Sequence, residues 1–265
     1  MDWLFLSKII SAVAAVLALT FVAERVSPRA GGLLAGYPLG TAIALFFIGV
    51  ENGPTFAVDA ALYTLPGFLS AMALAYGYFL GLQLNTKFSS LVSVLLSLAF
   101  FTCVSFVISK LAMTIWTAIA IPVFGIPIFN YLFKKLQNSK VGRPVAITWS
   151  VITIRAVSAA TMVVAITGLA ALIGPAWSGL LSAFPVSMLP FLVMLHITYG
   201  KENALTVIKN YPNGLGALIT YTITVYLTYN LIGIYLGTAL GFTAASIYLF
   251  ALATYIKKKE NTNAG

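Results

Sequence analysis

The stretch from Gly31 to Gly40 reads Gly-Gly-Leu-Leu-Ala-Gly-Tyr-Pro-Leu-Gly and places four glycines and a proline inside an otherwise apolar segment. Proline lacks the N–H group that would bond four residues back, and glycine accepts an unwound backbone at little steric cost. The stretch therefore predicts a kink or a break within a membrane helix. A similar stretch from Ser178 to Ser187, Ser-Gly-Leu-Leu-Ser-Ala-Phe-Pro-Val-Ser, predicts the same interruption in the second half of the chain.

Both stretches belong to a longer internal repeat. Sliding the chain on itself by 147 residues (179 minus 32) aligns them without a gap. Apolar composition alone does not explain matched prolines and glycines. The identical aligned pairs include Ser11 with Ser158, Thr20 with Thr167, Pro28 with Pro175, Gly32 with Gly179, Pro38 with Pro185 and Gly53 with Gly200.

The composition is that of a membrane protein. Of the 265 residues, 60% are hydrophobic and only 8% are charged. Long apolar runs without period-2 alternation predict helices rather than a barrel, because backbone polar groups in hydrocarbon must be satisfied internally. We therefore expect an all-α polytopic membrane protein. Nine candidate spans cover approximately 3–23, 31–50, 57–82, 88–109, 111–132, 146–171, 177–197, 204–229 and 232–256.

The distribution of basic residues orients these spans. The formal net charge is +9, which in a soluble protein would suggest nucleic acid, but here it follows from the positive-inside rule. With nine spans, one side receives only Lys110. The other side, expected to be cytoplasmic, receives Arg25, Arg29, Lys87, Lys134, Lys135, Lys140, Arg143, Lys201, Lys209, Lys257, Lys258 and Lys259. The rule predicts a protein of the cytoplasmic (inner) membrane with its N-terminus outside and its C-terminus in the cytoplasm.

The repeat is expected to be inverted. We assign repeat 1 to residues 1–110, a linker helix with a cytoplasmic loop to 111–145, repeat 2 to 146–256, and a disordered cytoplasmic tail to 257–265. Because an odd number of helices separates the two starts, the second copy enters the membrane from the opposite face. Inverted four-helix repeats are typical of secondary transporters that work by alternating access.

Two basic residues fall inside spans, and the repeat sets them opposite each other: Lys8 and Arg155. Each costs roughly 2.5–3.5 kcal/mol to insert at mid-membrane. Lys8 is close enough to the end of its span to snorkel, whereas Arg155 lies deeper, and no acidic residue lies deep in a span. Unpaired cations beside exposed helix N-termini favour a small anionic or zwitterionic solute. The expected substrate-binding residues are Lys8, Gly36, Tyr37, Pro38, Arg155, Phe184 and Pro185.

Other polar residues are weaker candidates for functional sites than Lys8 and Arg155. Glu51 and Asp59 are candidates for proton coupling, although acidic residues at a membrane interface are usually solvated. His196 is the only histidine, and no cluster of cysteine, histidine and carboxylate side chains predicts a metal site. Since no nucleophile has a base and an orienting group in the pattern, we expect neither an enzyme nor a cofactor.

Four functions fit this pattern. The first is a secondary transporter, and the second is a flippase of phospholipids or lipid-linked molecules that grips a phosphate headgroup. The third is a small-anion channel, because fused dual-topology fluoride channels share the four-one-four architecture. The fourth is an assembly factor for envelope machinery that transports nothing, in which the duplication only stabilises an antiparallel pair. Membrane lipid is an expected partner and nucleic acid is not, and the sequence leaves a homodimer open.

Three features stand out in residues 1–109: Lys8 early in the first helix, the Gly31 to Gly36 run with Pro38, and Gly49-Val50-Glu51-Asn52-Gly53. In these features the segment resembles the GlpM-like family of small inner-membrane proteins. Residues 146–256 resemble it more faintly, since Arg155 replaces the lysine and His196-Ile197-Thr198-Tyr199-Gly200 lacks the glutamate. The resemblance implies a fused, duplicated version of a four-helix protein, and it supplies no substrate.

Overall fold

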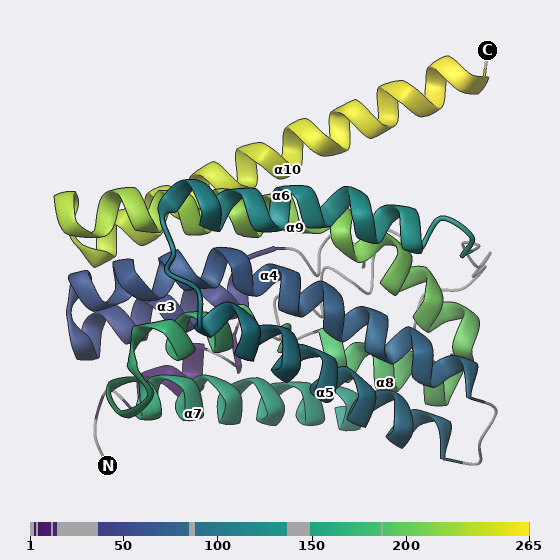
Figure 1. Cartoon of the computed structure of the whole chain (residues 1–265), viewed down its shortest axis with the longest axis horizontal. Helices are drawn as coiled ribbons and strands as arrows, with labels where there is room; N and C mark the ends of the chain where they lie inside the picture. Colours follow the sequence, from purple (N-terminus) through teal and green to yellow (C-terminus); the bar gives the residue numbers. More distant parts are fainter. Residues whose placement is uncertain are drawn as a thin grey trace.

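The structure is a computed structural model that describes residues 3, 5–11, 13, 14, 37–84, 88–136, 149–186 and 188–264. This part of the chain consists of helices joined by short turns (Figure 1). Residues 5–11 are helical and are called the N-terminal segment below. The helices that follow are α3 (Leu39–Asn52), α4 (Pro54–Gln83), α5 (Ser89–Ser109), α6 (Ile115–Leu132), α7 (Trp149–Ser182), α8 (Met188–Tyr199), α9 (Lys201–Ile232) and α10 (Ile234–Ala264).

Six stretches of helix are long and apolar enough to cross a membrane: Pro54–Gln83, Ser89–Ser109, Ile115–Leu132, Ala160–Ser182, Lys201–Ile232 and Ile234–Thr254. Their outer surfaces are apolar as well, with Trp116, Leu172 and Phe250 each more than three-quarters exposed. Exposed apolar surface on this scale is a liability in water but matches lipid. The expectation of an all-α membrane protein is confirmed.

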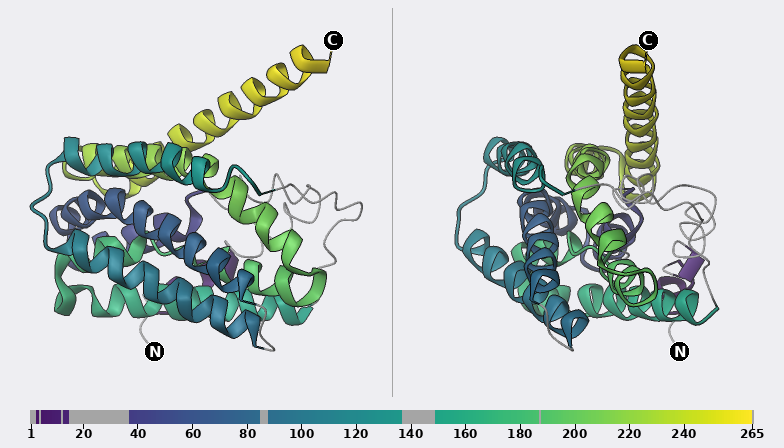
Figure 2. Two further views of the ribbon diagram at one scale, coloured as in Figure 1. Left: turned by 45° about the vertical axis from the view of Figure 1, so that its right-hand side comes forward. Right: turned by 90° about the vertical axis from the view of Figure 1, so that its right-hand side faces the viewer.

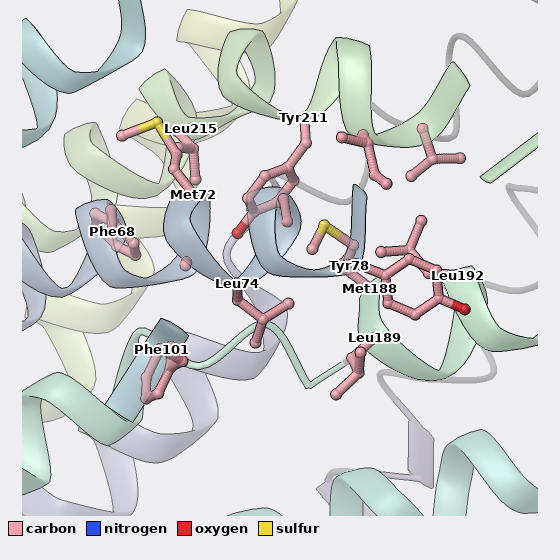
Figure 3. Close-up of a cluster of buried hydrophobic side chains, with 14 of the residues drawn as sticks. Phe68, Met72, Leu74, Tyr78, Phe101, Met188, Leu189, Leu192, Tyr211 and Leu215 are labelled. Atoms are coloured by element: carbon pink, nitrogen blue, oxygen red, sulfur yellow. The ribbon is translucent and has the colours of Figure 1, made fainter. Parts of the chain in front are cut away.

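Helices α4 and α9 form the centre of the bundle. In its most apolar window α4 is 78% buried, whereas the corresponding figures for α6 and α10 are 17%. Figure 3 shows side chains of α4, α8 and α9 meeting in one apolar cluster, with Tyr211 beside Met72. The peripheral helices α5, α6 and α10 thus form the surface that lipid would cover.

Small residues allow the helices to approach closely. A Cβ added to Gly81 of α4 would lie 2.3 Å from the Cα of Ser93 on α5, and one added to Gly179 of α7 would lie 2.0 Å from the carbonyl oxygen of Ala60. Glycine at such positions lets two backbones touch, which is how membrane helices pack when there is no water to exclude.

Corresponding helices run in opposite directions. In Figure 1, α4 runs from left to right and α9 runs from right to left, while α5 and α10 also oppose each other. The junction of α3 with α4 lies at the left end of the bundle, and the junction of α8 with α9 lies at the right end. The basic residues Lys134 and Lys135 follow the right-hand end of α6, and Lys110 follows the left-hand end of α5.

The interruption predicted between Ser178 and Ser187 is present. The last part of α7 ends at Ser182, and α8 begins at Met188. At 1.5 Å per residue the 12 residues of α8 reach only about 18 Å, well short of a hydrocarbon core of about 30 Å. Before this break the chain also turns sharply at Gly174, whose φ is +75°, followed by Pro175.

Pro38 is the N-cap of α3, which begins at Leu39. Residues 31–36 of the stretch expected to be interrupted lie outside the described residues, so the kink or break predicted there stays a prediction. The 14 residues of α3 reach about 21 Å, so α3 is also a half-length helix. The tail expected to be disordered over 257–265 is helical through Ala264, and the end of α10 extends away from the bundle (Figures 1 and 2).

Candidate functional site

The chain has the same backbone geometry at the starts of α3 and α8, which are called the first and the second break below. At the first break, the N–H of Leu39 donates to the carbonyl of Tyr37 at 2.8 Å, closing a three-residue turn around Pro38. The N–H of Ala42 then donates to the Pro38 carbonyl at 2.7 Å, which starts α3.

At the second break, the N–H of Val186 donates to the carbonyl of Phe184 at 2.8 Å, around Pro185. The N–H of Leu189 donates to the Pro185 carbonyl at 3.2 Å. Each of these donors and acceptors lies 147 residues after its counterpart at the first break (for example, 185 minus 38). The same proline turn therefore opens both half-length helices.

These breaks touch each other inside the bundle. The hydroxyl of Thr41, in the first turn of α3, donates to the carbonyl of Ser182 at 2.9 Å. A Cβ on Gly40 would lie 3.9 Å from the side chain of Val186. Thr41, Ser182 and Val186 are all buried, so the crossing is closed to bulk solvent in this conformation.

A second hydroxyl contact holds the helix that leads to the break. The Thr64 hydroxyl of α4 donates to the carbonyl of Gly179 on α7 at 3.0 Å. Carbonyls in the last turn of a helix have no partner within that helix, so a side-chain donor or the next turn must satisfy them. Thr41 and Thr64 together fix the end of α7 against α3 and α4.

Lys8 of the N-terminal segment is paired with Glu51 of α3. The Lys8 Nζ lies 2.6 Å from the Glu51 Oε1, and the two side chains are 5% and 25% exposed. The expectation that Lys8 is an unpaired or snorkelling cation is therefore wrong, whereas Glu51 stays in contact with solvent while it holds the ion pair. Glu51 lies in the last turn of α3, where the helix dipole disfavours a negative charge, so Lys8 is its natural counter-ion.

The remaining expected site residues lie apart from this pair. Tyr37 stacks on Phe242 of α10 and its hydroxyl is 3.1 Å from that of Ser246, whereas Phe184 packs edge-to-face on Phe101 of α5. Asp59 is exposed on α4. The aromatic neighbours of the two prolines thus point to different helices. The contacts between the two breaks come from residues beside the prolines, with Thr41 against Ser182 and Gly40 against Val186.

Two expected site residues lie wholly or partly outside the described part of the structure. Gly36 lies outside the described residues. Arg155 lies in the second turn of α7, but its side chain is also outside the described part. Any contact of Arg155 with the crossing therefore stays a prediction.

The sequence did not predict a cavity of about 210 Å³ beside α3. It lies between the N-terminal segment, α3 and α10, and opens to the molecular surface. Its lining consists of apolar side chains with two hydroxyls, from Ser11, Ala42, Ile43, Phe46, Phe47, Thr238 and Phe242. Ala42 and Ile43 belong to the start of α3, so the cavity begins next to the crossing of the two breaks. Its residues are ordinary packing residues in the sequence, and no motif marks them.

Other polar contacts tie helices together. His196 of α8 has its Nδ1 3.3 Å from the hydroxyl of Tyr78 on α4. Asn130 of α6 donates to Asn213 of α9 at 3.0 Å. Across the described ranges, no group of three His, Cys, Asp or Glu side chains is placed to hold a metal ion.

Comparison of the chain with known protein families, with characterised proteins and with solved structures finds no match.

Proposed function

We propose that this protein is a secondary transporter that works by alternating access, built from two inverted repeats joined by the linker helix α6. The observation that carries the proposal is the recurrence of one proline turn at two positions, Tyr37 to Leu39 and Phe184 to Val186, at two helix starts linked by the buried hydrogen bond from Thr41 to Ser182. Broken helices that meet between two halves are the usual site of substrate binding in transporters of this kind.

Further features recur with the same spacing. Gly53 and Gly200, 147 residues apart, have φ values of +90° and +87° and precede α4 and α9. The paired helices α3 and α8, α4 and α9, and α5 and α10 occupy corresponding stretches of sequence, and the long ones run in opposite directions (Figure 1). These features support an inverted duplication, in which exchanging the conformations of the two halves would turn an outward-open form into an inward-open one.

We propose a small anionic or zwitterionic solute as substrate. The half-length helices α3 and α8 both begin at the crossing, and a helix N-terminus carries partial positive charge from unpaired N–H groups. Lys8 adds a cation at the far end of α3, and we propose that Arg155 has the equivalent role in the second repeat. Glu51 and Asp59 stay candidates for proton coupling.

The proposed orientation follows the basic residues. The end of α6 and the start of α9 lie at the right-hand end of the bundle in Figure 1, and the end of α5 lies at the left-hand end. Lys134 and Lys135 follow α6 and Lys201 begins α9, whereas Lys110 follows α5. By the positive-inside rule, the right-hand end would face the cytoplasm. The full nine-span topology, with the N-terminus outside and the C-terminus inside, is part of this proposal.

Alternating access can be tested without knowing the substrate. In a Cys103→Ser background, Ala183→Cys places a thiol at the closed crossing. In sealed vesicles, we expect a membrane-impermeant thiol reagent to label this position slowly from either side.

Cross-linking Thr55→Cys to Asn230→Cys, whose parent side chains are 3.4 Å apart, would hold the left-hand end of the bundle closed. Labelling should then persist from the other side only. Labelling from one side regardless of the cross-link, or from neither side, would contradict alternating access.

The lipid flippase is the second candidate. The cavity beside α3 is largely apolar, is open to the molecular surface and is lined in part by α10, the end of which leaves the bundle (Figure 2). A side opening of this kind could admit a lipid chain. Reconstituted protein would then move a fluorescent phospholipid between leaflets faster than protein-free vesicles, and an unchanged rate would remove this candidate.

A further inference from the structure

We propose that the cavity beside α3 binds a small carboxylate with an apolar body, and that Glu51 is an internal stand-in for the carboxylate of this ligand. The inference rests on the proposed transporter and narrows its substrate class. It is carried by two independent observations, the volume and lining of the cavity and the position of the Lys8–Glu51 pair, of which Lys8 is the buried member.

The cavity suits an aromatic or branched hydrocarbon group. Three phenylalanines and two aliphatic side chains line it, and only the hydroxyls of Ser11 and Thr238 are polar. An apolar cavity of roughly 150 Å³ is enough to hold benzene. At about 210 Å³, this cavity has room for a benzene ring and one carboxylate, but not for a whole phospholipid.

The Lys8–Glu51 ion pair lies about one helical turn from the cavity lining, both along the N-terminal segment and along α3. Ser11 lies three residues after Lys8 on the N-terminal segment, and Phe47 lies four residues before Glu51 on α3. Side chains three or four residues apart in a helix are neighbours. A ligand in the cavity could therefore place its carboxylate within reach of Lys8.

Lys8 needs a negative partner at all times. Its side chain is only 5% exposed, and a buried ammonium without a counter-ion is strongly unfavourable. Glu51 is five times more exposed, so it can turn towards the surface at smaller cost. When a carboxylate ligand enters, it would take the place of Glu51 on Lys8, and Glu51 would move to solvent. Glu51 thus competes with the ligand, and removing its charge should tighten binding.

Benzoate is a suitable probe for this exchange, with benzamide as its neutral counterpart. Binding of radiolabelled benzoate would be measured on the purified chain in lipid nanodiscs. We expect Glu51→Gln to bind benzoate at least fivefold more tightly than the unchanged chain, because the competing carboxylate is gone. The double variant Lys8→Met/Glu51→Gln buries no charge and should lose benzoate binding. Ser11→Leu, which fills the cavity and leaves the pair intact, should also weaken it.

A second readout covers the case in which Glu51→Gln folds poorly. In the unchanged chain benzoate should bind better than benzamide, and the double variant should lose this preference. Equal or weaker binding by Glu51→Gln, benzoate binding by the double variant, or equal binding of benzamide would each overturn the inference. None of these outcomes affects labelling of Ala183→Cys, so the inference can fail while the transporter proposal stands.

Discussion

Lys8 and Glu51 show how burial decides the consequence of losing one member of an ion pair. Removing one partner of a buried pair leaves the other charge uncompensated, at a cost of about 3–5 kcal/mol when that charge is fully buried. Here the two partners are buried to different extents, since 5% of the Lys8 side chain and 25% of the Glu51 side chain are exposed. The two single substitutions should therefore differ.

We expect Glu51→Gln to lower the free energy of unfolding by about 3 kcal/mol, because it leaves Lys8 buried and unpaired. Lys8→Met should cost less, since Glu51 can reach water. The double variant should recover most of the loss. Unfolding in mixed detergent micelles, followed by circular dichroism, measures all three. A larger loss for Lys8→Met than for Glu51→Gln would contradict the assignment of Lys8 as the buried partner.

The sequence predicted both members of this pair as notable residues but not their contact. Lys8 and Glu51 are separated by more than forty positions, and no periodic pattern links the first helix to the end of α3. An i, i+4 pair within one helix can be predicted from spacing, but a pair between helices depends on packing. The cavity beside α3 was missed for the same reason, because its lining comes from three separate segments.

At the scale of the helices, glycine and proline gave the most reliable signals. Pro185 predicted the break before α8, and Gly200 coincides with the start of α9. Pro38 was also predicted to interrupt a helix. The structure has it as the N-cap of α3, and the residues before Tyr37 lie outside the described part of the chain. Proline is tolerated at the first positions of a helix because no N–H is needed there, so composition alone could not distinguish a kink from a start.

Replacing glycine by alanine should have opposite effects on stability before a helix, where φ is positive, and inside a helix. Gly53 and Gly168 test these two cases. Gly53 has a φ of +90° and Gly168 lies within α7, and a Cβ added to either would meet no neighbour within 4 Å. Gly53→Ala should destabilise the protein by about 1–2 kcal/mol, because an L side chain disfavours positive φ. Gly168→Ala should stabilise it by up to about 1 kcal/mol, because alanine is the better helix former.

Thermal unfolding in the same detergent checks both variants in parallel. Because neither added methyl group meets a neighbour, the difference in stability between the two variants reports the backbone conformation at the two glycines alone. A stabilising Gly53→Ala would mean that α3 and α4 are one continuous helix, which would remove a feature shared with the junction of α8 and α9.

At the scale of the whole molecule, the account depends on two copies of one helical unit facing opposite ways. The opposed directions of α4 and α9 and the matched proline turns support this arrangement (Figure 1). It would explain why the two breaks contact each other, since a two-fold axis in the membrane plane brings equivalent segments together. The GlpM-like resemblance of the first half stays a prediction beside it.

The most direct measurement compares two equivalent positions across the membrane. Thr55 and Glu202 are 147 residues apart, both are exposed, and each is the second residue of its helix, α4 or α9. In a Cys103→Ser background, Thr55→Cys and Glu202→Cys would be labelled with an impermeant thiol reagent in intact cells and in inside-out vesicles. The account predicts labelling of Thr55→Cys from outside and of Glu202→Cys from the cytoplasmic side. Labelling of both from the same side would contradict it.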